Sequence, residues 1–159
     1  MISIKPATED ILPRLLEIEQ ETFTNPWTYG MFQEEFLRQD SFFTVISENG
    51  NPLGFCILRR MTDDEGQLFN IAVAKSARRQ GFADTLMKVA IRHAEDNGLK
   101  SLYLEVRESN EAAIALYGQH GFKQVGTRKG YYDKPTEDAL IMTKDIVPGS
   151  GTGCCAGRG

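Results

Sequence analysis

Two cations and a glycine stand together at the start of a predicted helix, in the segment Arg78-Arg79-Gln80-Gly81-Phe82-Ala83. Unpaired main-chain N–H groups and the positive end of the helix dipole converge at such a place. Gly81 has no Cβ, and Ala83 is small, so a phosphate can approach the main chain closely. Neither G-x-x-x-x-G-K-[ST] nor G-x-G-x-x-G occurs in the chain. The spacing therefore favours a diphosphate in another kind of carrier, and a solvated basic turn is the alternative if the loop is considered alone.

A single carboxylate, Glu105, lies in the apolar stretch LYLEV, which alternates as a strand does. Partial burial would raise its pKa toward neutrality, where a carboxylate can act as a general base. The alternative is an exposed or ion-paired strand carboxylate. His93 and His120 show no sign of ligation, and no metal site is predicted.

Hydrophobic spacing and turn residues predict a mixed α/β (α+β) domain with about seven strands and about four helices. The predicted strands cover 2–6, 41–48, 53–61, 68–73, 99–106, 122–127 and 139–145. The predicted helices start after Thr8, at Thr28, at about Ala83 and at either Ser109 or Asn110. The turn at Asn49-Gly50 indicates antiparallel strands in the N-terminal part, whereas the later strand-helix-strand unit indicates a parallel pair. The second helix is expected to run from Thr28 to about Gln39, with Met31, Phe32, Phe36 and Leu37 buried.

The length and net charge of the chain limit the classes of function that it can have. The chain has 159 residues, which predicts one domain on a prior of roughly 150 residues each. With 18 Lys and Arg against 22 Asp and Glu, the net charge is −4, so no broad surface for nucleic acid is expected. No apolar run approaches the roughly 20 residues of a membrane span, and the N-terminus lacks a signal-peptide layout. The expected location is the cytoplasm, without a membrane partner, and no oligomeric state is predicted.

The three cysteines do not suggest a disulfide framework. Cys56 lies in the apolar run LGFCIL and is expected to be a small buried side chain rather than a nucleophile. Cys154 and Cys155 belong to a glycine-rich tail, 148–159, which is predicted to be flexible and to follow a single domain, 1–147. The adjacent pair is weak evidence for metal binding or oxidation.

The loop matches the [Q/R]-x-x-G-x-[G/A] signature of the GCN5-related N-acetyltransferases, and the predicted order of elements resembles that family from Ile2 to Asp145. The stretches LFNIAV, RRQGFADTLM, LYLEVRESNEAAIALYGQHGF and YYDKPTEDALIM, with NPW at 25–27, are similar to its bacterial branch that acetylates ribosomal proteins. The resemblance implies that acetyl-CoA is the donor. The implied acceptor is a protein N-terminal amine, the alanine of small-subunit ribosomal protein eighteen.

The resemblance also implies residue roles. Glu105 corresponds to the general base and Tyr117 to the general acid, although Tyr117 could instead be a core aromatic. Asn110 corresponds to a cofactor contact and is equally suited to capping a helix. The implied cofactor-binding residues are Ile71, Ala72 and Val73 on the strand, and Arg78, Arg79, Gln80, Gly81, Phe82, Ala83 and Asp84 in the loop and helix.

Three aromatic residues in predicted loops, Trp27, Tyr131 and Tyr132, correspond to the walls of the acceptor channel, with ordinary packing as the alternative for each. Trp27, between the first two predicted helices, is expected to be exposed. Acidic side chains could attract a basic N-terminal segment, or could simply be solvated; they are Glu35, Asp63, Asp64, Glu65, Glu137 and Asp138. Two other functions stay open at this point. One is acetylation of lysine side chains or of a small amine, and the other is a non-catalytic acyl-CoA sensor, which would need the loop but neither Glu105 nor Tyr117.

Overall fold

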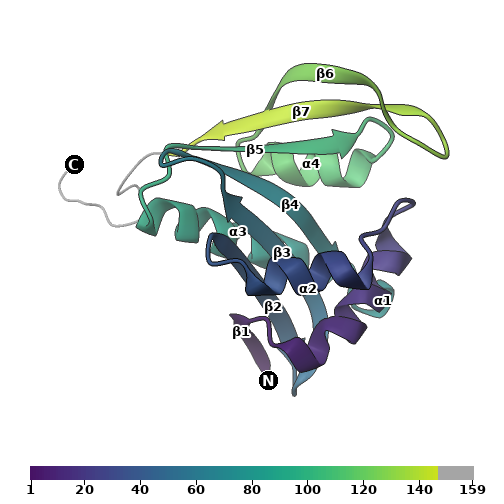
Figure 1. Ribbon diagram of the computed structural model, residues 1–159, viewed down its shortest axis with the longest axis vertical. Helices are drawn as coiled ribbons and strands as arrows, with labels where there is room; N and C mark the ends of the chain where they lie inside the picture. Colours follow the sequence, from purple (N-terminus) through teal and green to yellow (C-terminus); the bar gives the residue numbers. More distant parts are fainter. Residues whose placement is uncertain (147–159) are drawn as a thin grey trace. The chain divides into compact units, whose positions relative to one another are not determined.

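The computed structural model describes residues 1–146. These residues form seven strands and four α-helices, which confirms the predicted mixed α/β (α+β) fold (Figure 1). The strand order is β1-β2-β3-β4-β5-β7-β6. Strands β4 and β5 are parallel, and the pairs β1–β2, β2–β3, β5–β7 and β6–β7 are antiparallel. The tail predicted at 148–159, with Cys154 and Cys155, lies outside the described residues.

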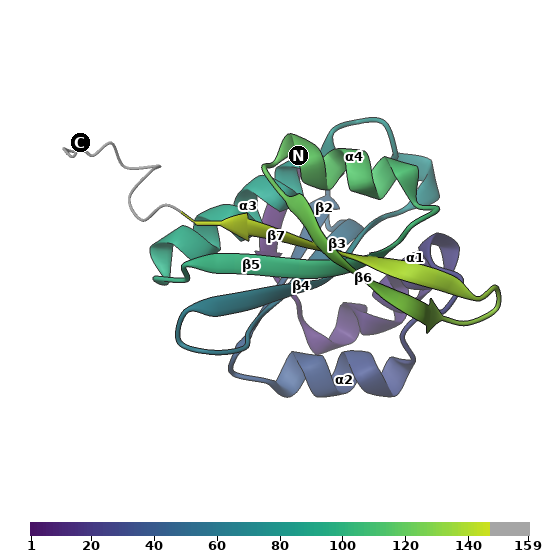
Figure 2. The same cartoon turned by 90° about the horizontal axis from the view of Figure 1, so that it is seen from above.

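The chain divides into two compact units, and the first contains Met1–Arg59 and Phe69–Met87. Its elements are β1 (Ile2–Pro6), α1 (Leu12–Thr22), α2 (Tyr29–Leu37), β2 (Ser41–Glu48), most of β3 (Asn51–Arg60), the end of β4 (Glu65–Val73) and the start of α3 (Phe82–Asp96). Figure 2 shows α1 and α2 together on one side of the strands. Phe32 of α2 packs against Phe43 of β2 and Phe55 of β3, with ring centroids 6.1 and 5.5 Å apart.

Two predicted helix starts differ in outcome. Thr28 does cap α2, because its hydroxyl accepts a hydrogen bond from the N–H of Met31 at 3.2 Å. Thr8, however, precedes a short 3-10 turn (Glu9–Ile11) without a side-chain cap, and α1 begins only at Leu12. Pro13 stands in the first turn of α1, where its missing N–H is tolerated.

The predicted burial in α2 is partly wrong. Phe32 is buried, but Met31 and Leu37 are exposed by 40% and 77%. The helix ends at Leu37, two residues earlier than expected, and Glu35 takes the buried position three residues after Phe32. The carboxylate of Glu35 forms an ion pair with Arg59 on β3, which is why an acidic residue can occupy the apolar face.

The second unit contains Arg60–Leu68 and the described residues from Lys88 onward. Its elements are the start of β4, the rest of α3, β5 (Ser101–Arg107), α4 (Glu111–Gln119), β6 (Lys123–Tyr132) and β7 (Glu137–Asp145). Strand β5 alternates as predicted, with Leu102, Leu104 and Val106 buried. Figures 1 and 2 show α4 alongside these strands.

The last hairpin is longer than predicted. Strand β6 continues to Tyr132, so Tyr131 and Tyr132 lie at the end of a strand and not in a loop. The strand continues because its pairing with β7 resumes after an irregularity, with Tyr132 opposite Glu137. In the part of the chain that the structure describes, no helix is both long enough and apolar enough to cross a membrane.

Candidate functional site

The end of β4 and the loop after it carry the predicted anion-binding residues. Ala72 and Val73 are buried, and the N–H of Ala74 donates to the carbonyl of Leu53 on β3 at 2.7 Å. A short 3-10 turn (Lys75–Ala77) follows, and its first N–H donates to Glu21 of α1 at 3.0 Å. The loop therefore leaves the strand on a course fixed by both β3 and α1.

Arg78 has a structural role in this loop. Its Nε donates to the carbonyl of Val73 at 3.1 Å, and its Nη2 donates to the hydroxyl of Thr22 at 3.3 Å. These bonds tie the side chain back to β4 and α1. Arg78 thus holds the loop in shape although, like Arg79 and Gln80, it is exposed to solvent.

The main chain of the loop adopts the left-handed conformation at two positions where the anion site is predicted. Arg79 and Gly81 have positive φ values, +67° and +81°, on either side of Gln80. Changes of backbone handedness of this kind turn successive N–H groups toward one concavity. Helix α3 begins at Phe82, so the N–H groups of its first turn have no partner within the helix. Space is open around the Cα of Gly81, with no heavy atom within 4 Å of a built Cβ.

The side chain of Glu105 lies in a cluster within the second unit. It forms an ion pair with Arg128 of β6, with Nε and Oε2 at 2.8 Å, and its side chain is 13% exposed. The phenol of Tyr131 donates a hydrogen bond to the same carboxylate. Burial first, and then the charge and hydrogen bond of Glu105, raise the pKa of Tyr131. Burial and the charge of Glu105 likewise raise the pKa of Tyr132 to about 12.

The structure therefore brings three predicted residues together, because Glu105, Tyr131 and Tyr132 share one cluster. Arg128 was not predicted, and no local pattern in β6 marks it. Arg107 completes the cluster: its guanidinium lies 4.5 Å from the ring centroid of Tyr132 and 3.1 Å from the carboxylate of Glu137.

Helix α4 places Asn110 and Tyr117. The side chain of Asn110 accepts a hydrogen bond from the N–H of Ala113 at 3.2 Å, which confirms its predicted role as a helix cap. Tyr117 is 9% exposed and packs against Phe122 with ring centroids 5.9 Å apart. Packing therefore accounts for its ring, and a role for its hydroxyl stays a prediction.

Trp27 lies in the segment between α1 and α2, as predicted, but it is half-buried rather than exposed. The centroid of its ring lies 5.5 Å from that of Phe32 and 6.2 Å from that of Phe69. Its main-chain N–H donates a hydrogen bond to the carboxylate of Glu19 at 2.9 Å. Glu19 was not predicted as a functional residue, and Glu35 was predicted only as an acidic side chain that could attract a basic segment. Each falls on the apolar stripe of its helix, four residues after Leu15 and three after Phe32, and that position could have revealed a buried carboxylate.

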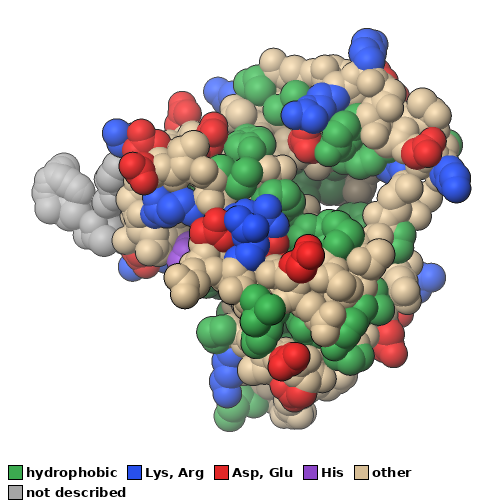
Figure 3. All heavy atoms as spheres, viewed as in Figure 1, with side chains coloured by type: hydrophobic (Ala, Val, Ile, Leu, Met, Phe, Trp, Pro, Cys, Tyr) green, Lys and Arg blue, Asp and Glu red, His purple; other side chains and the backbone are tan. Residues whose placement is uncertain are grey.

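Several of the predicted acidic residues are paired with cations inside their own unit. Glu35 is buried against Arg59, so it was wrong to count it among accessible charges. Glu137 bonds to Arg107 and Ser109, and Asp138 to Lys129 and the N–H of Gly130. On the face drawn in Figure 3, cationic and anionic side chains are interspersed rather than gathered by sign.

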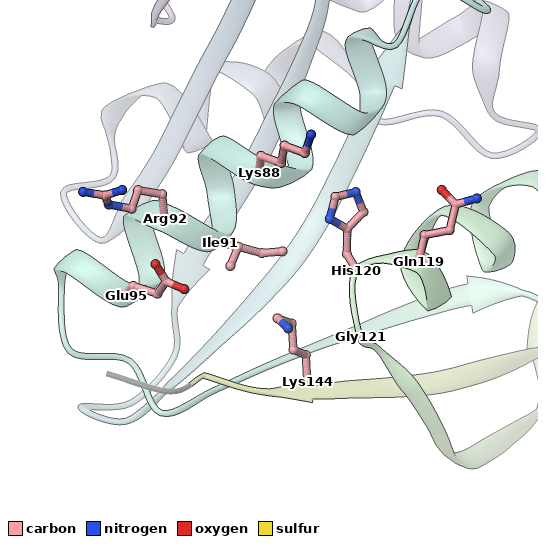
Figure 4. A pocket seen from close by; sticks show the side chains of 8 residues that line it. All are labelled: Lys88, Ile91, Arg92, Glu95, Gln119, His120, Gly121 and Lys144. Atoms are coloured by element: carbon pink, nitrogen blue, oxygen red, sulfur yellow. The ribbon is translucent and has the colours of Figure 1, made fainter. Parts of the chain in front are cut away.

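An open cleft of about 560 Å³ lies in the second unit, and none of the predicted site residues lines it. Figure 4 shows its lining from α3, the end of α4 and β7: Lys88, Ile91, Arg92, Glu95, Gln119, His120, Gly121 and Lys144. Arg92 is paired with Asp96 at 3.2 Å, and its side chain points away from His120 in Figure 4. Among residues 1–146, no three His, Cys, Asp or Glu side chains are grouped so that they could hold a metal ion.

Residues 12–122 match the model of the acetyltransferase (GNAT) family. This chain belongs to that family, the GCN5-related N-acetyltransferases, as its loop signature and order of elements indicated.

Individual relatives are more specific than the family model. It is 39% identical over 139 residues to the [ribosomal protein bS18]-alanine N-acetyltransferase of Escherichia coli, covering 85% of this chain and 91% of that protein. It is 37% identical over 133 residues to the enzyme of that name from Haemophilus influenzae, covering 81% and 88%. The crystal structure of the ribosomal-protein-S18-alanine N-acetyltransferase from Escherichia coli superposes with a TM-score of 0.86 at 34% identity, covering 99% of this chain and 97% of that one. The resemblance to this branch of the family is thereby confirmed.

Proposed function

We propose that this chain transfers the acetyl group of acetyl-CoA to the N-terminal amine of a protein, and that its acceptor is the N-terminal alanine of ribosomal protein bS18. The observation that supports this choice of acceptor is the structural similarity to the Escherichia coli enzyme over 99% of the chain. The donor is supported by the anion-binding shape of the main chain at Arg79–Gly81 and by membership of the family.

In the proposed reaction, the first unit binds the donor. Main-chain groups of Ile71, Ala72 and Val73 hold the pantetheine arm, and the N–H groups from Gln80 to Asp84 hold the diphosphate. Arg79 supplies a mobile charge, while Arg78 acts through the loop that it braces. Asp84 contributes its N–H only, because its carboxylate would repel a phosphate.

The second unit supplies the acid and the base. Glu105 accepts a proton from the acceptor ammonium, the amine nitrogen bonds to the thioester carbonyl carbon, and the carbon–sulfur bond breaks. Tyr117 donates a proton to the departing thiolate, and the second proton that the nitrogen loses on becoming an amide returns to the Tyr117 phenolate through solvent. Asn110 contacts the cofactor as well as capping α4. An α-amino group has a pKa near 8 and a lysine near 10.4, so a carboxylate base is better suited to a protein N-terminus. Trp27, Tyr131 and Tyr132 contact the acceptor segment.

The test is an acetyl-transfer assay with a peptide that copies the N-terminus of bS18. An N-terminally blocked peptide that carries a lysine is the competing substrate. We expect acetylation of the free N-terminal amine and little of the lysine. Preference for the lysine peptide would replace the proposed acceptor, and absence of transfer to any amine, with donor binding intact, would indicate a sensor.

The role of Glu105 is tested in the same assay with Glu105→Gln, and the matched control is Glu108→Gln, an exposed carboxylate just beyond β5. We expect Glu105→Gln to lower kcat by about a hundredfold or more, because a general base contributes roughly that factor. Calorimetric affinity for CoA should stay close to that of the wild type in both variants. Unchanged turnover in Glu105→Gln would remove this residue from the mechanism.

A further inference from the structure

Glu19 is a buried carboxylate that the proposed chemistry does not use. Its side chain, on α1, is 1% exposed. One carboxylate oxygen accepts a hydrogen bond from the main-chain N–H of Trp27 at 2.9 Å, and the other accepts one from Nδ2 of Asn70 at 2.9 Å. Both donors are neutral groups. Burial is the main influence on this carboxyl group, and it raises the pKa of Glu19.

The two hydrogen bonds join segments that are far apart in the chain. Trp27 belongs to the segment between α1 and α2, and Asn70 stands on β4 directly before Ile71. Asn70 is itself 5% exposed. Glu19 therefore fastens the main chain at Trp27 to the strand that we assign to the donor.

The ring of Trp27 depends on the same attachment. It packs against Phe32 of α2 and Phe69 of β4, the residue before Asn70. Arg59 lies over Phe69, with its guanidinium 4.2 Å from the ring centroid, and forms an ion pair with Glu35. The hydrogen bond to the main-chain N–H of Trp27 thus also fixes the position of its ring against Phe32 and Phe69.

A carboxylate suits this position better than other side chains. Two donors converge on it, and an ionised carboxylate offers two acceptor oxygens and no donor. A glutamine would turn its NH₂ group toward one of the donors. Burying a polar side chain is unfavourable unless hydrogen bonds offset its desolvation, so a residue chosen for stability alone would be apolar. The arrangement is therefore explained by the geometry that it imposes.

We propose that Glu19 is a positioning residue for the acceptor: it fixes the Trp27 segment to β4 and so sets the affinity for the acceptor N-terminus. The inference rests on the proposed function, in which Trp27 contacts the acceptor. It adds a residue that touches neither substrate and acts through the main chain of Trp27.

The kinetic test separates this role from a purely structural one. We expect Glu19→Ala to raise KM for the bS18 peptide about tenfold, the equivalent of one lost hydrogen bond to a charged group. KM for acetyl-CoA should stay within about twofold, because the strand of the donor is also held through its main chain. Asn70→Ala should have a smaller effect, and the double variant should resemble Glu19→Ala, because both residues act through one contact.

Two controls and one conservative variant keep the test decisive. Glu17→Gln changes the same charge on the same helix at an exposed position. Ile57→Val removes one methyl group from a fully buried position of β3 and reports what a loss of stability alone does. Glu19→Gln keeps the size of the side chain, so this variant should fold even if Glu19→Ala fails to fold. It should raise KM for the peptide by less than Glu19→Ala does.

A second measurement does not depend on activity. The chain has 1 tryptophan, so fluorescence excited selectively from tryptophan, and not from the 5 tyrosines, reports on Trp27 alone. Acrylamide should quench this fluorescence more efficiently in Glu19→Ala and Glu19→Gln than in the wild type, Glu17→Gln or Ile57→Val.

The outcomes distinguish the inference from the proposed function. An unchanged peptide KM together with unchanged quenching would overturn the inference, and so would equal increases in both KM values. If the wild type does not acetylate the peptide, the proposed function fails. Quenching then still decides whether Glu19 holds the Trp27 segment.

Discussion

Gly54 provides a test of how strictly the donor strand is placed. It lies on β3, opposite Ile46 of β2, with an ordinary φ that alanine can adopt. A Cβ built on Gly54 would stand 2.7 Å from the carbonyl oxygen of Ala72 and 3.2 Å from Cγ2 of Val73. Both residues belong to the segment of β4 that we assign to the pantetheine arm.

The magnitude follows from the contact distances. To restore an ordinary separation of 3.4 Å, the carbonyl of Ala72 must move by about 0.7 Å. Overpacking of this kind typically costs about 1–3 kcal/mol of unfolding free energy. If the shift also removes one main-chain hydrogen bond to the donor, of about 1 kcal/mol, the Kd for CoA rises about fivefold.

The assay is calorimetric titration of Gly54→Ala with CoA, accompanied by urea unfolding. Gly30→Ala is the matched control, because the nearest atom to its built Cβ is 3.9 Å away, and alanine within a helix is expected to stabilise by about 0.5–1 kcal/mol. A Gly54→Ala variant with wild-type stability and wild-type affinity would refute the reasoning. Lost stability with unchanged affinity would instead show that Ala72 and Val73 do not bind the donor.

Three further predictions concern single side chains. Tyr117→Phe should keep the ring packed on Phe122 but should lower kcat in the acetyl-transfer assay; equal turnover would show that the ring alone matters. Asn110→Ala should lower the unfolding free energy by about 1 kcal/mol through loss of the helix cap, measured by urea unfolding, and an unchanged midpoint would contradict that role. Burial raises the pKa of Cys56 from about 9 to about 12. Its folded form therefore keeps a proton that the unfolded chain releases, and this group lowers stability as the pH rises through that window. At pH 8 the native wild type and Cys56→Ala should show the same number of reactive thiols, and one more in the wild type would mean that Cys56 is accessible.

The elements could be predicted where the signal is local. The turn at Asn49-Gly50 has positive φ at both residues, and Gly98 follows the last turn of α3 with φ +74°. Asn110 caps α4 because its side chain reaches an N–H three residues away. The parallel pair β4–β5 follows from the strand-helix-strand order, because a crossover through a helix returns the chain in the same direction.

The end of β6 could not be predicted in this way. The stretch RKGYYDKPTED contains turn residues and charges, and its local composition is typical of a loop. What extends the strand is pairing with β7, together with contacts from Arg107, which donates to the carbonyls of Asp133 and Pro135. Those partners are more than 25 residues from Arg107 in the chain, so the local pattern carries no trace of them.

The same reason explains which parts of the candidate site stayed hidden. Glu105 and Tyr131 were each chosen for their type, but the contact between them depends on the pairing of β5, β7 and β6. Glu19 and Asn70 are 51 residues apart, and Glu35 and Arg59 are 24 apart. A buried carboxylate is stable only if donors reach it, so its position on an apolar helix face predicts that partners exist without saying which they are. Polar residues on the apolar face of a helix, such as Glu19 and Glu35, therefore indicate buried hydrogen-bonding partners that the sequence motifs do not reveal.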